Sequence, residues 1–334
     1  MDARPLDLAD DAEVQQFYDV SWRAEMDDGR PWNVHWSREE LLTTLREPTA
    51  DQRMEGFVVV DGDRVVASGV LGLSLRDNVD KAWAYPMVDP PRRRAGAGTA
   101  LVGAMLARCR ELGRPTVSMN AAYAGPEDPD APPVAFALSL GFRQSYSEIF
   151  RRLDLPVPAD LLDRLDGEGR AHHDGYQIET YVGDVPDHLL PSYCALVNLL
   201  GVDAPSGDVT YEAAGMTPDS ARERSEQNKR MGRRVFHALA VRDREAVAMT
   251  DLAVVPSGDE ALQWATYVHR QHRGHRLGAA VKVANLRALQ EQCPEVTRVD
   301  TENAETNKYM VSINEALGFE IVAVSPHFVL EQEI

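Results

Sequence analysis

Two loop sequences that match each other, 180 positions apart, constrain this chain more than any other feature. Loop 1 spans residues 88–99 and loop 2 spans residues 268–279. In each, a β-like run ends at Val, an Arg follows five residues later, and a Gly five residues after that opens an alanine-rich stretch. Such a strand, loop and helix N-terminus can hold phosphate, because the first backbone N–H groups of a helix are unpaired and its dipole favours an anion. The two loops predict two copies of one phosphate-binding fold.

A second pair of landmarks supports the repeat. Gly141-Phe142 and Gly318-Phe319 end helix-like segments and lie 177 positions apart, close to the spacing of the loops. Two matched landmarks in the same order indicate an internal duplication.

The chain has 334 residues, a length that favours two domains. Prolines and a charged run mark residues 156–175 as a linker. We therefore expect an N-terminal domain over residues 1–155 and a C-terminal domain over residues 176–334.

Composition excludes several classes of function. The net charge of −18 disfavours nucleic-acid binding, which requires neutralisation of phosphates, and favours small cationic partners. A mean hydropathy of −0.34 and the lack of a long apolar run argue against a membrane segment, and the N-terminus does not resemble a signal peptide. Three widely spaced cysteines predict neither a disulfide framework nor a zinc site. We expect a cytoplasmic protein, monomeric or homodimeric, without a metal.

The loops fit neither of two common nucleotide-binding motifs. Residues 93–98 read R-x-x-G-x-G and residues 273–278 read R-x-x-R-x-G. A dinucleotide fingerprint needs G-x-G-x-x-G/A, but Leu101 occupies the third small position after Gly96 and Gly98. Neither loop has the Gly-Lys-Ser/Thr of a Walker motif.

These motifs resemble those of the GNAT N-acetyltransferase superfamily, whose pattern is Q/R-x-x-G-x-G/A between a central strand and a long helix. Both halves match, and the chain is similar to actinobacterial two-domain proteins of the mycothiol synthase type. The second half adds Thr-Glu-Asn-Ala-Glu-Thr-Asn at 301–307. The resemblance implies an α/β fold of two tandem GNAT-like domains, each with a mixed, mostly antiparallel sheet flanked by helices.

The resemblance also implies a cofactor site. Acetyl-CoA would lie in a V-shaped gap beside the central strand, with the N–H of Val268 facing the thioester carbonyl. Asn307 would bind the pantetheine arm or phosphates, or simply cap a helix, and Asn303 is included in the site although its role is more structural. The residues expected around the pyrophosphate in loop 2 are Arg273, Gly274, His275, Arg276, Leu277, Gly278 and Ala279. Their counterparts in loop 1 are Val88, Arg93, Arg94, Ala95, Gly96, Ala97, Gly98 and Thr99.

The sequence offers several candidates for the catalytic residues. The general acid in this family is usually a Tyr four residues before the Gly of the Gly-Phe pair, where this chain has Asn314 and, in the first half, Ala137. Tyr267 and Tyr309 are alternative proton donors. Asp251, with apolar neighbours that would raise its pKa, and Glu260 are the candidates for the general base.

We expect the second half to be catalytic, because a Pro-rich insertion at 125–133 interrupts the first half. The first half would be structural or retain a vestigial cofactor site. The predicted reaction moves an acetyl group to a primary amine of a small, cationic metabolite by direct attack, since no Cys or Ser stands in an activated setting. The alternatives are a non-catalytic acyl-CoA-binding protein and a nucleotide-dependent enzyme on a Rossmann-like fold.

Overall fold

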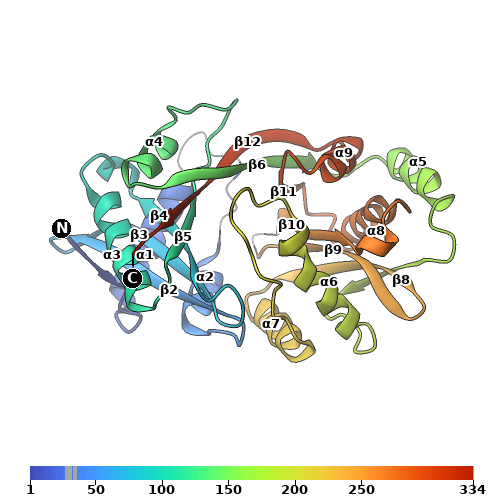
Figure 1. Ribbon diagram of the computed structural model, residues 1–334, viewed down its shortest axis with the longest axis horizontal. Helices are drawn as coiled ribbons and strands as arrows, with labels where there is room; N and C mark the ends of the chain where they lie inside the picture. Colours follow the sequence, from blue (N-terminus) through green and yellow to red (C-terminus); the bar gives the residue numbers. More distant parts are fainter. Residues whose placement is uncertain (27–31, 33–35, 257, 334) are drawn as a thin grey trace. The chain divides into compact units, whose positions relative to one another are not determined.

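The computed structural model describes residues 1–26, 32, 36–256 and 258–333. It divides into two compact units (Figure 1). Unit 1 consists of Met1–Glu148, Gly207–Val209 and Ala323–Ile334, and unit 2 consists of Ile149–Ser206 and Thr210–Val322.

Unit 1 is built on a sheet with the strand order β1-β2-β3-β4-β5-β12. All its described neighbours pair antiparallel except β4 and β5, which are parallel. Its elements in the first half of the chain are β1 (Asp2–Pro5), α1 (Asp11–Glu25), α2 (Arg38–Arg46), β2 (Gln52–Asp61), β3 (Arg64–Ser74), β4 (Lys81–Val88), α3 (Ala97–Glu111), β5 (Thr116–Asn120), α4 (Pro132–Ser139) and the start of β6 (Arg143–Asp154).

Unit 2 repeats this plan with the strand order β6-β11-β10-β9-β8-β7, in which β10 and β11 are the parallel pair. The fold is therefore the predicted pair of mixed, mostly antiparallel α/β domains. Its elements are α5 (Ala159–Arg170), β7 (Gln177–Val182), α6 (Leu190–Asp203), α7 (Pro218–Arg230), β8 (Arg234–Arg242), β9 (Glu245–Val254), β10 (Glu260–Val268), α8 (Leu277–Gln292), β11 (Arg298–Ala304), α9 (Lys308–Leu317) and the start of β12 (Glu320–Glu331).

The two units exchange their last strands, which the sequence did not predict. β12, at the C-terminus, pairs antiparallel with β5 of unit 1, with Phe328 opposite Met119 (Figure 1). Residues 149–154 of β6 belong to unit 2, where Arg152 forms an ion pair with Asp300 on β11. The predicted boundaries of 1–155 and 176–334 therefore differ from the structure at both strands. Each strand follows a Gly-Phe pair and has the same local pattern, so the sequence alone does not show which sheet it joins.

The predicted linker over residues 156–175 contains a helix. Pro158 is the N-cap residue of α5, and leucines of this helix pack against the core of unit 2. The prolines start the helix rather than prevent it, because the first turn of a helix does not need their missing N–H groups.

The two faces of the sheet of unit 2 differ chemically, because side chains alternate along a strand. Phe236 and Leu252 belong to the apolar core that includes α8. His237 and Asp251, one position away on the same strands, point to the opposite face, where Asp251 meets Tyr193 of α6. This alternation separates an apolar face from one that carries titratable groups.

Candidate active site

A gap opens between the two parallel strands of unit 2. Residues 260–262 of β10 pair with residues 298–300 of β11, whereas β10 continues to Val268 and β11 to Ala304. Among the described residues of unit 1, β4 and β5 likewise pair at 81–83 and 116–118, and β4 continues to Val88. Strands that part in this way leave backbone groups unpaired, which a bound molecule can satisfy. This is the geometry of the V-shaped gap that the resemblance implies.

A β-bulge lies at the open part of β10. The register with β9 shifts between Gln263 and Ala265. The side-chain amide of Gln263 stabilises the bulge by donating to Thr250 Oγ1 at 2.9 Å and to the carbonyl of Asp251 at 2.7 Å. Bulges of this kind bend a strand away from its partner and are frequent next to active sites.

The two loops have the same backbone conformation although their sequences differ. In loop 1, φ is +63° at Arg94 and +88° at Gly96; at the equivalent places in loop 2, φ is +86° at Gly274 and +54° at Arg276. The left-handed conformation is thus conserved at both places, while glycine occupies one in each loop. This conformation turns the chain into the helix that follows.

The N-termini of the helices after both loops lack side-chain caps. Gly96 precedes α3 and Arg276 precedes α8, and neither provides a side-chain hydrogen bond to the first turn. The N–H groups at the start of α8 are therefore available to an anion. This arrangement supports the predicted pyrophosphate site at residues 273–279.

Gly278 is needed for close packing beside loop 2. A Cβ at this position would lie 3.1 Å from Ile313 Cδ1 of α9 and 3.7 Å from Val268 Cγ2. In unit 1, a Cβ at Gly98 would lie 3.0 Å from the ring of Phe136 in α4. The second glycine of each motif therefore lets a helix approach the loop.

Asp203, at the end of α6, binds three side chains of loop 2 and β10. Its carboxylate accepts hydrogen bonds from Tyr267 Oη at 2.8 Å and Arg273 Nη2 at 2.6 Å, and it forms an ion pair with Arg270. The Asp203 side chain is 6% exposed, and the arginines lower its pKa. Tyr267 and the motif residue Arg273 thus hold the loop, and the Tyr267 hydroxyl is already bonded. Sequence reasoning missed Asp203, which lies in a segment without a motif.

Asp251, the predicted base, lies in a buried hydrogen-bonded group and not among apolar side chains. Tyr193 Oη donates to its Oδ2 at 2.8 Å, and His237 Nδ1 lies 2.7 Å from its Oδ1. His237 Nε2 also faces the carbonyl of Gly183 at 3.2 Å, so both ring nitrogens suit a protonated imidazole. Burial alone would lower the His237 pKa, but Asp251 outweighs it and raises the pKa overall. The Asp251 carboxylate is thus held by two polar side chains that the sequence pattern did not predict.

Glu260, the other candidate for the general base, lies away from the gap. It is 2% exposed at the start of β10 and forms an ion pair with Arg298, its register partner on β11. Burial raises the pKa of Glu260, and Arg298 opposes this effect. Because it stands where β10 and β11 are still paired, the geometry favours a structural role.

The asparagines of the second half have protein partners. Asn307 caps α9, its Oδ1 accepting from Met310 N at 3.3 Å. Asn303 Oδ1 accepts from Asn314 Nδ2 at 3.0 Å, and Asn314 Oδ1 accepts from Lys282 Nζ at 2.7 Å. Tyr309, suggested as a proton donor, is 88% exposed. Lys282 was missed by sequence reasoning, although a lysine among the apolar positions of α8 was the available signal.

The histidines of loop 2 bind protein groups. His272 Nδ1 lies 2.9 Å from Tyr176 Oη, and His275 Nδ1 lies 2.9 Å from the carbonyl of His172. In the described part of the chain, no three His, Cys, Asp or Glu side chains are grouped so that they could hold a metal ion. Within the same residues, no helix is long and apolar enough to cross a membrane.

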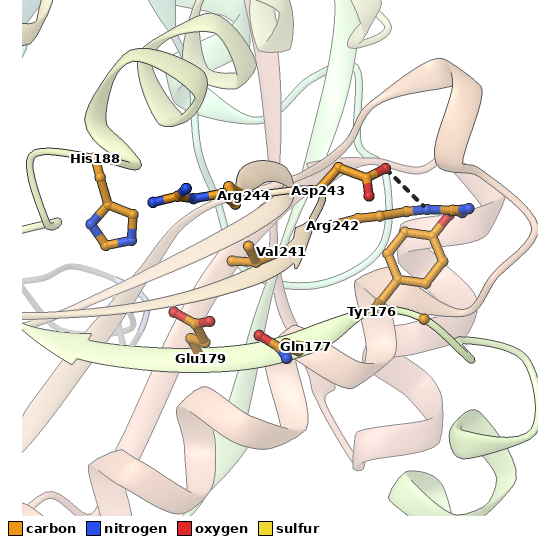
Figure 2. Close-up of a pocket in the computed structure, with 9 residues that line it drawn as sticks. Tyr176, Gln177, Glu179, His188, Val241, Arg242, Asp243 and Arg244 are labelled. Atoms are coloured by element: carbon orange, nitrogen blue, oxygen red, sulfur yellow. Dashed lines mark hydrogen bonds and ion pairs between the residues drawn. The ribbon is translucent and has the colours of Figure 1, made fainter.

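Tyr176 also borders a cavity of about 620 Å³ at the edge of unit 2 (Figure 2). Arg242, which donates to Tyr176 Oη at 3.1 Å, and Arg244 line it together with Glu179 and Asp243. The lining carries charges of both signs and none of the predicted site residues, so we do not place the reaction there.

Comparisons with known proteins identify the family and the fold. The protein-family model of the acetyltransferase (GNAT) domain matches residues 3–128 of the sequence. A tandem GNAT protein from the clavulanic acid biosynthesis pathway, solved without acetyl-CoA, is 30% identical over 99% of this chain and 98% of its own, with a TM-score of 0.78. A GCN5-related N-acetyltransferase from Sphaerobacter thermophilus shares the fold with a TM-score of 0.64 at 17% identity, over 99% of this chain and 95% of its own. A search of curated protein sequences found no match.

The fold and the family model define an acetyltransferase of a family that uses acyl-CoA. The chain belongs to the GNAT acetyltransferase family and has its tandem form.

Proposed function

We propose that this protein transfers the acetyl group of acetyl-CoA to a primary amine of a small, cationic metabolite, and that the reaction takes place in unit 2. The observation that carries the proposal is the set of buried polar groups that flank the open gap of unit 2. Unit 1 has a similar loop and gap, yet Val70 occupies the register position equivalent to Asp251. The family model matches unit 1, which in our proposal serves as a scaffold or a second cofactor site.

The first support is the fit of the cofactor to unit 2. The uncapped N–H groups of Leu277, Gly278 and Ala279 offer donors to the pyrophosphate. The pantetheine arm would continue into the gap between β10 and β11. The N–H of Val268 would stabilise the oxyanion of the tetrahedral intermediate, as preorganised donors do in acyl transfer.

The second support concerns the route of transfer. All three cysteines are buried, and burial raises the pKa of the Cys109 thiol to about 11 and also raises that of Cys293. A buried thiol of raised pKa is a poor nucleophile, which favours direct attack by the amine over an acyl-enzyme.

The acceptor amine is inferred from the charge of the protein and from the position of Asp251. The net charge of −18 favours a cationic acceptor in the cytoplasm. We keep Asp251 as the candidate base because it pairs with Ala265 at the bulge of β10. Tyr193 and His237 would hold its carboxylate in position.

A matched pair of substitutions tests the assignment to unit 2. Ala279 is the third residue of α8, and Thr99 is the third residue of α3. A glutamate there suits a free helix N-terminus but repels a phosphate, so both variants should fold. Ala279→Glu should weaken acetyl-CoA binding in unit 2 by about 100-fold and abolish turnover, because like charges brought together cost several kcal/mol.

Thr99→Glu should leave turnover within about threefold of the wild type. Calorimetry with acetyl-CoA and the release of free thiol with a panel of amines provide the two readouts. Loss of turnover in Thr99→Glu, with Ala279→Glu unaffected, would move the reaction to unit 1. Binding without thiol release from any amine would favour the non-catalytic acyl-CoA-binding protein.

A further inference from the structure

Unit 2 contains a chain of buried polar side chains behind its gap. Lys282 Nζ donates to Asn314 Oδ1 at 2.7 Å, Asn314 Nδ2 donates to Asn303 Oδ1 at 3.0 Å, and Arg151 Nη1 donates to the same Asn303 oxygen at 3.2 Å. Lys282 is 1% exposed and Arg151 is 2% exposed. The group brings two cationic side chains and no carboxylate into the interior of the unit.

The fold does not require these polar groups, because unit 1 has apolar residues at the same places. The correspondence follows from the loops, the Gly-Phe pairs, and the registers of β4 with β5 and of β10 with β11. Lys282, Asn314, Asn303 and Arg151 correspond to Val102, Ala137, Ala121 and Phe328, all in the hydrophobic core of unit 1. Burying a cation is costly, so a polar set in one unit and an apolar set in the other indicate a specific role in unit 2.

The Lys282 ammonium lacks acceptors for most of its N–H groups. Among the described residues, Asn314 is its hydrogen-bond acceptor, and the ring of Phe319 lies 5.5 Å from Nζ. The other charged side chain of the cluster is Arg151, a second cation. Burial lowers the pKa of Arg151, and the charges of Glu305 and Glu315 oppose this effect. Burial lowers the pKa of Lys282 to about 7. A buried donor of this kind calls for an acceptor that the protein itself does not supply.

The position of Lys282 shows where such an acceptor would come from. Lys282 lies one turn beyond Gly278 on the same face of α8, the face that approaches Ile313 of α9. Asn303 lies three residues beyond the last paired residue of β11, on the border of the gap. The cluster therefore flanks the path from loop 2 into the gap.

We propose that Lys282 stabilises and protonates the thiolate of CoA as it leaves the tetrahedral intermediate. The proposal rests on acetyl-CoA binding in unit 2, as proposed above. When the carbonyl re-forms, the C–S bond breaks and its electron pair stays on sulfur. The sulfur takes a proton from the Lys282 ammonium, which becomes a neutral amine and regains a proton from solvent after CoA departs. The proton released by the acceptor nitrogen passes to the base or to water, so the charges balance.

The ultraviolet absorbance of the thiolate in the complex with CoA tests this without an acceptor amine. The Thr99→Glu background removes any contribution of loop 1. Bound CoA should ionise about 1–3 pH units below free CoA, because a nearby cation favours the thiolate. Lys282→Val should abolish this shift while the affinity for acetyl-CoA, which has no free thiol, stays within about threefold.

The double variant Lys282→Val/Asn314→Ala guards against misfolding, since it reproduces residues found at these places in unit 1. It should behave like Lys282→Val. An unshifted thiol in the wild-type complex, or a shift that survives in either variant, would overturn the proposal and leave the acetyltransferase function intact. Failure of CoA to bind the Thr99→Glu protein at all would instead refute cofactor binding in unit 2.

Discussion

Gly96 and Arg276 hold the same left-handed backbone conformation at the same place in the two units, with φ of +88° and +54°. A side chain at Gly96 would meet little, since the nearest atom to its Cβ would be Met1 Cε at 3.8 Å. The cost of Gly96→Ala is therefore conformational, and we expect a loss of about 1 kcal/mol in the free energy of unfolding. Gly103→Ala, in the open interior of α3, should instead stabilise by about 0.5–1 kcal/mol. Urea denaturation measures both, and equal effects would contradict this account of loop 1.

Asp203→Asn should loosen loop 2. The variant loses ion pairs to Arg270 and Arg273, and we expect it to destabilise by about 1–2 kcal/mol, since both arginines are half exposed. Because the pKa of Asp203 is lowered in the folded protein, this stabilisation is present above the ordinary value of 3.8 and is lost as the pH falls below it. Unfolding free energies of wild type and variant should therefore converge at acid pH. A difference that is constant from neutral to acid pH would argue against the ion pairs.

Asp251→Asn tests the candidate base. A positioned general base contributes about 10²–10⁴ in rate, so kcat/KM should fall by that factor. Acetyl-CoA affinity should not change, because loop 2 is untouched. Thiol release measured across pH with an active amine provides the readout, and a full rate at neutral pH would mean that the amine binds already neutral or loses its proton to water.

Glu260→Gln should separate stability from activity. The variant breaks the ion pair between buried Glu260 and partly exposed Arg298 and should destabilise by about 1–3 kcal/mol, as expected when a hydrogen-bonded charged partner is removed. Turnover below the unfolding temperature should stay within about threefold, because Glu260 lies in the paired part of β10. A rate loss like that of Asp251→Asn would restore Glu260 as a candidate base.

The pair of His237 and Asp251 should give unit 2 a pH-dependent stability. The pKa of His237 is raised above 6.5 in the folded protein, so the stabilisation is complete below that value and is lost as the pH rises through the folded pKa. The stability difference between wild type and His237→Gln should shrink as the pH rises above 6.5 and through the raised pKa of the folded protein. A difference that grows over this range would contradict a protonated His237.

Local sequence predicted the features that adjacent residues encode, such as the two loops, each of which lies between a strand and a helix. The turn at Asp61-Gly62-Asp63, for example, joins β2 and β3, with Asp61 opposite Arg64. Such turns are encoded by adjacent residues. The parting of the central strands, which was implied by the family resemblance and not by local sequence, appears in both units.

Contacts between distant residues could not be predicted in the same way. Asp203 meets Arg273 across 70 positions, and Arg151 meets Asn303 across 152. Neither pair shares a periodic pattern, so only the folded chain reveals that the motif arginine holds its own loop. The surroundings of Asp251 depend on His237 and Tyr193 from two other elements and were missed for the same reason.

The placement of β12 in the sheet of unit 1 has a consequence for biosynthesis. This strand is synthesised after all the other elements of both units, so β5 has an unpaired edge until those elements have been made. Exposed edges of this kind invite pairing with other chains. Cutting the gene between the two repeats would separate β12 from unit 1 and β6 from unit 2. The two halves of the duplicated sequence therefore do not correspond to two independently folding proteins.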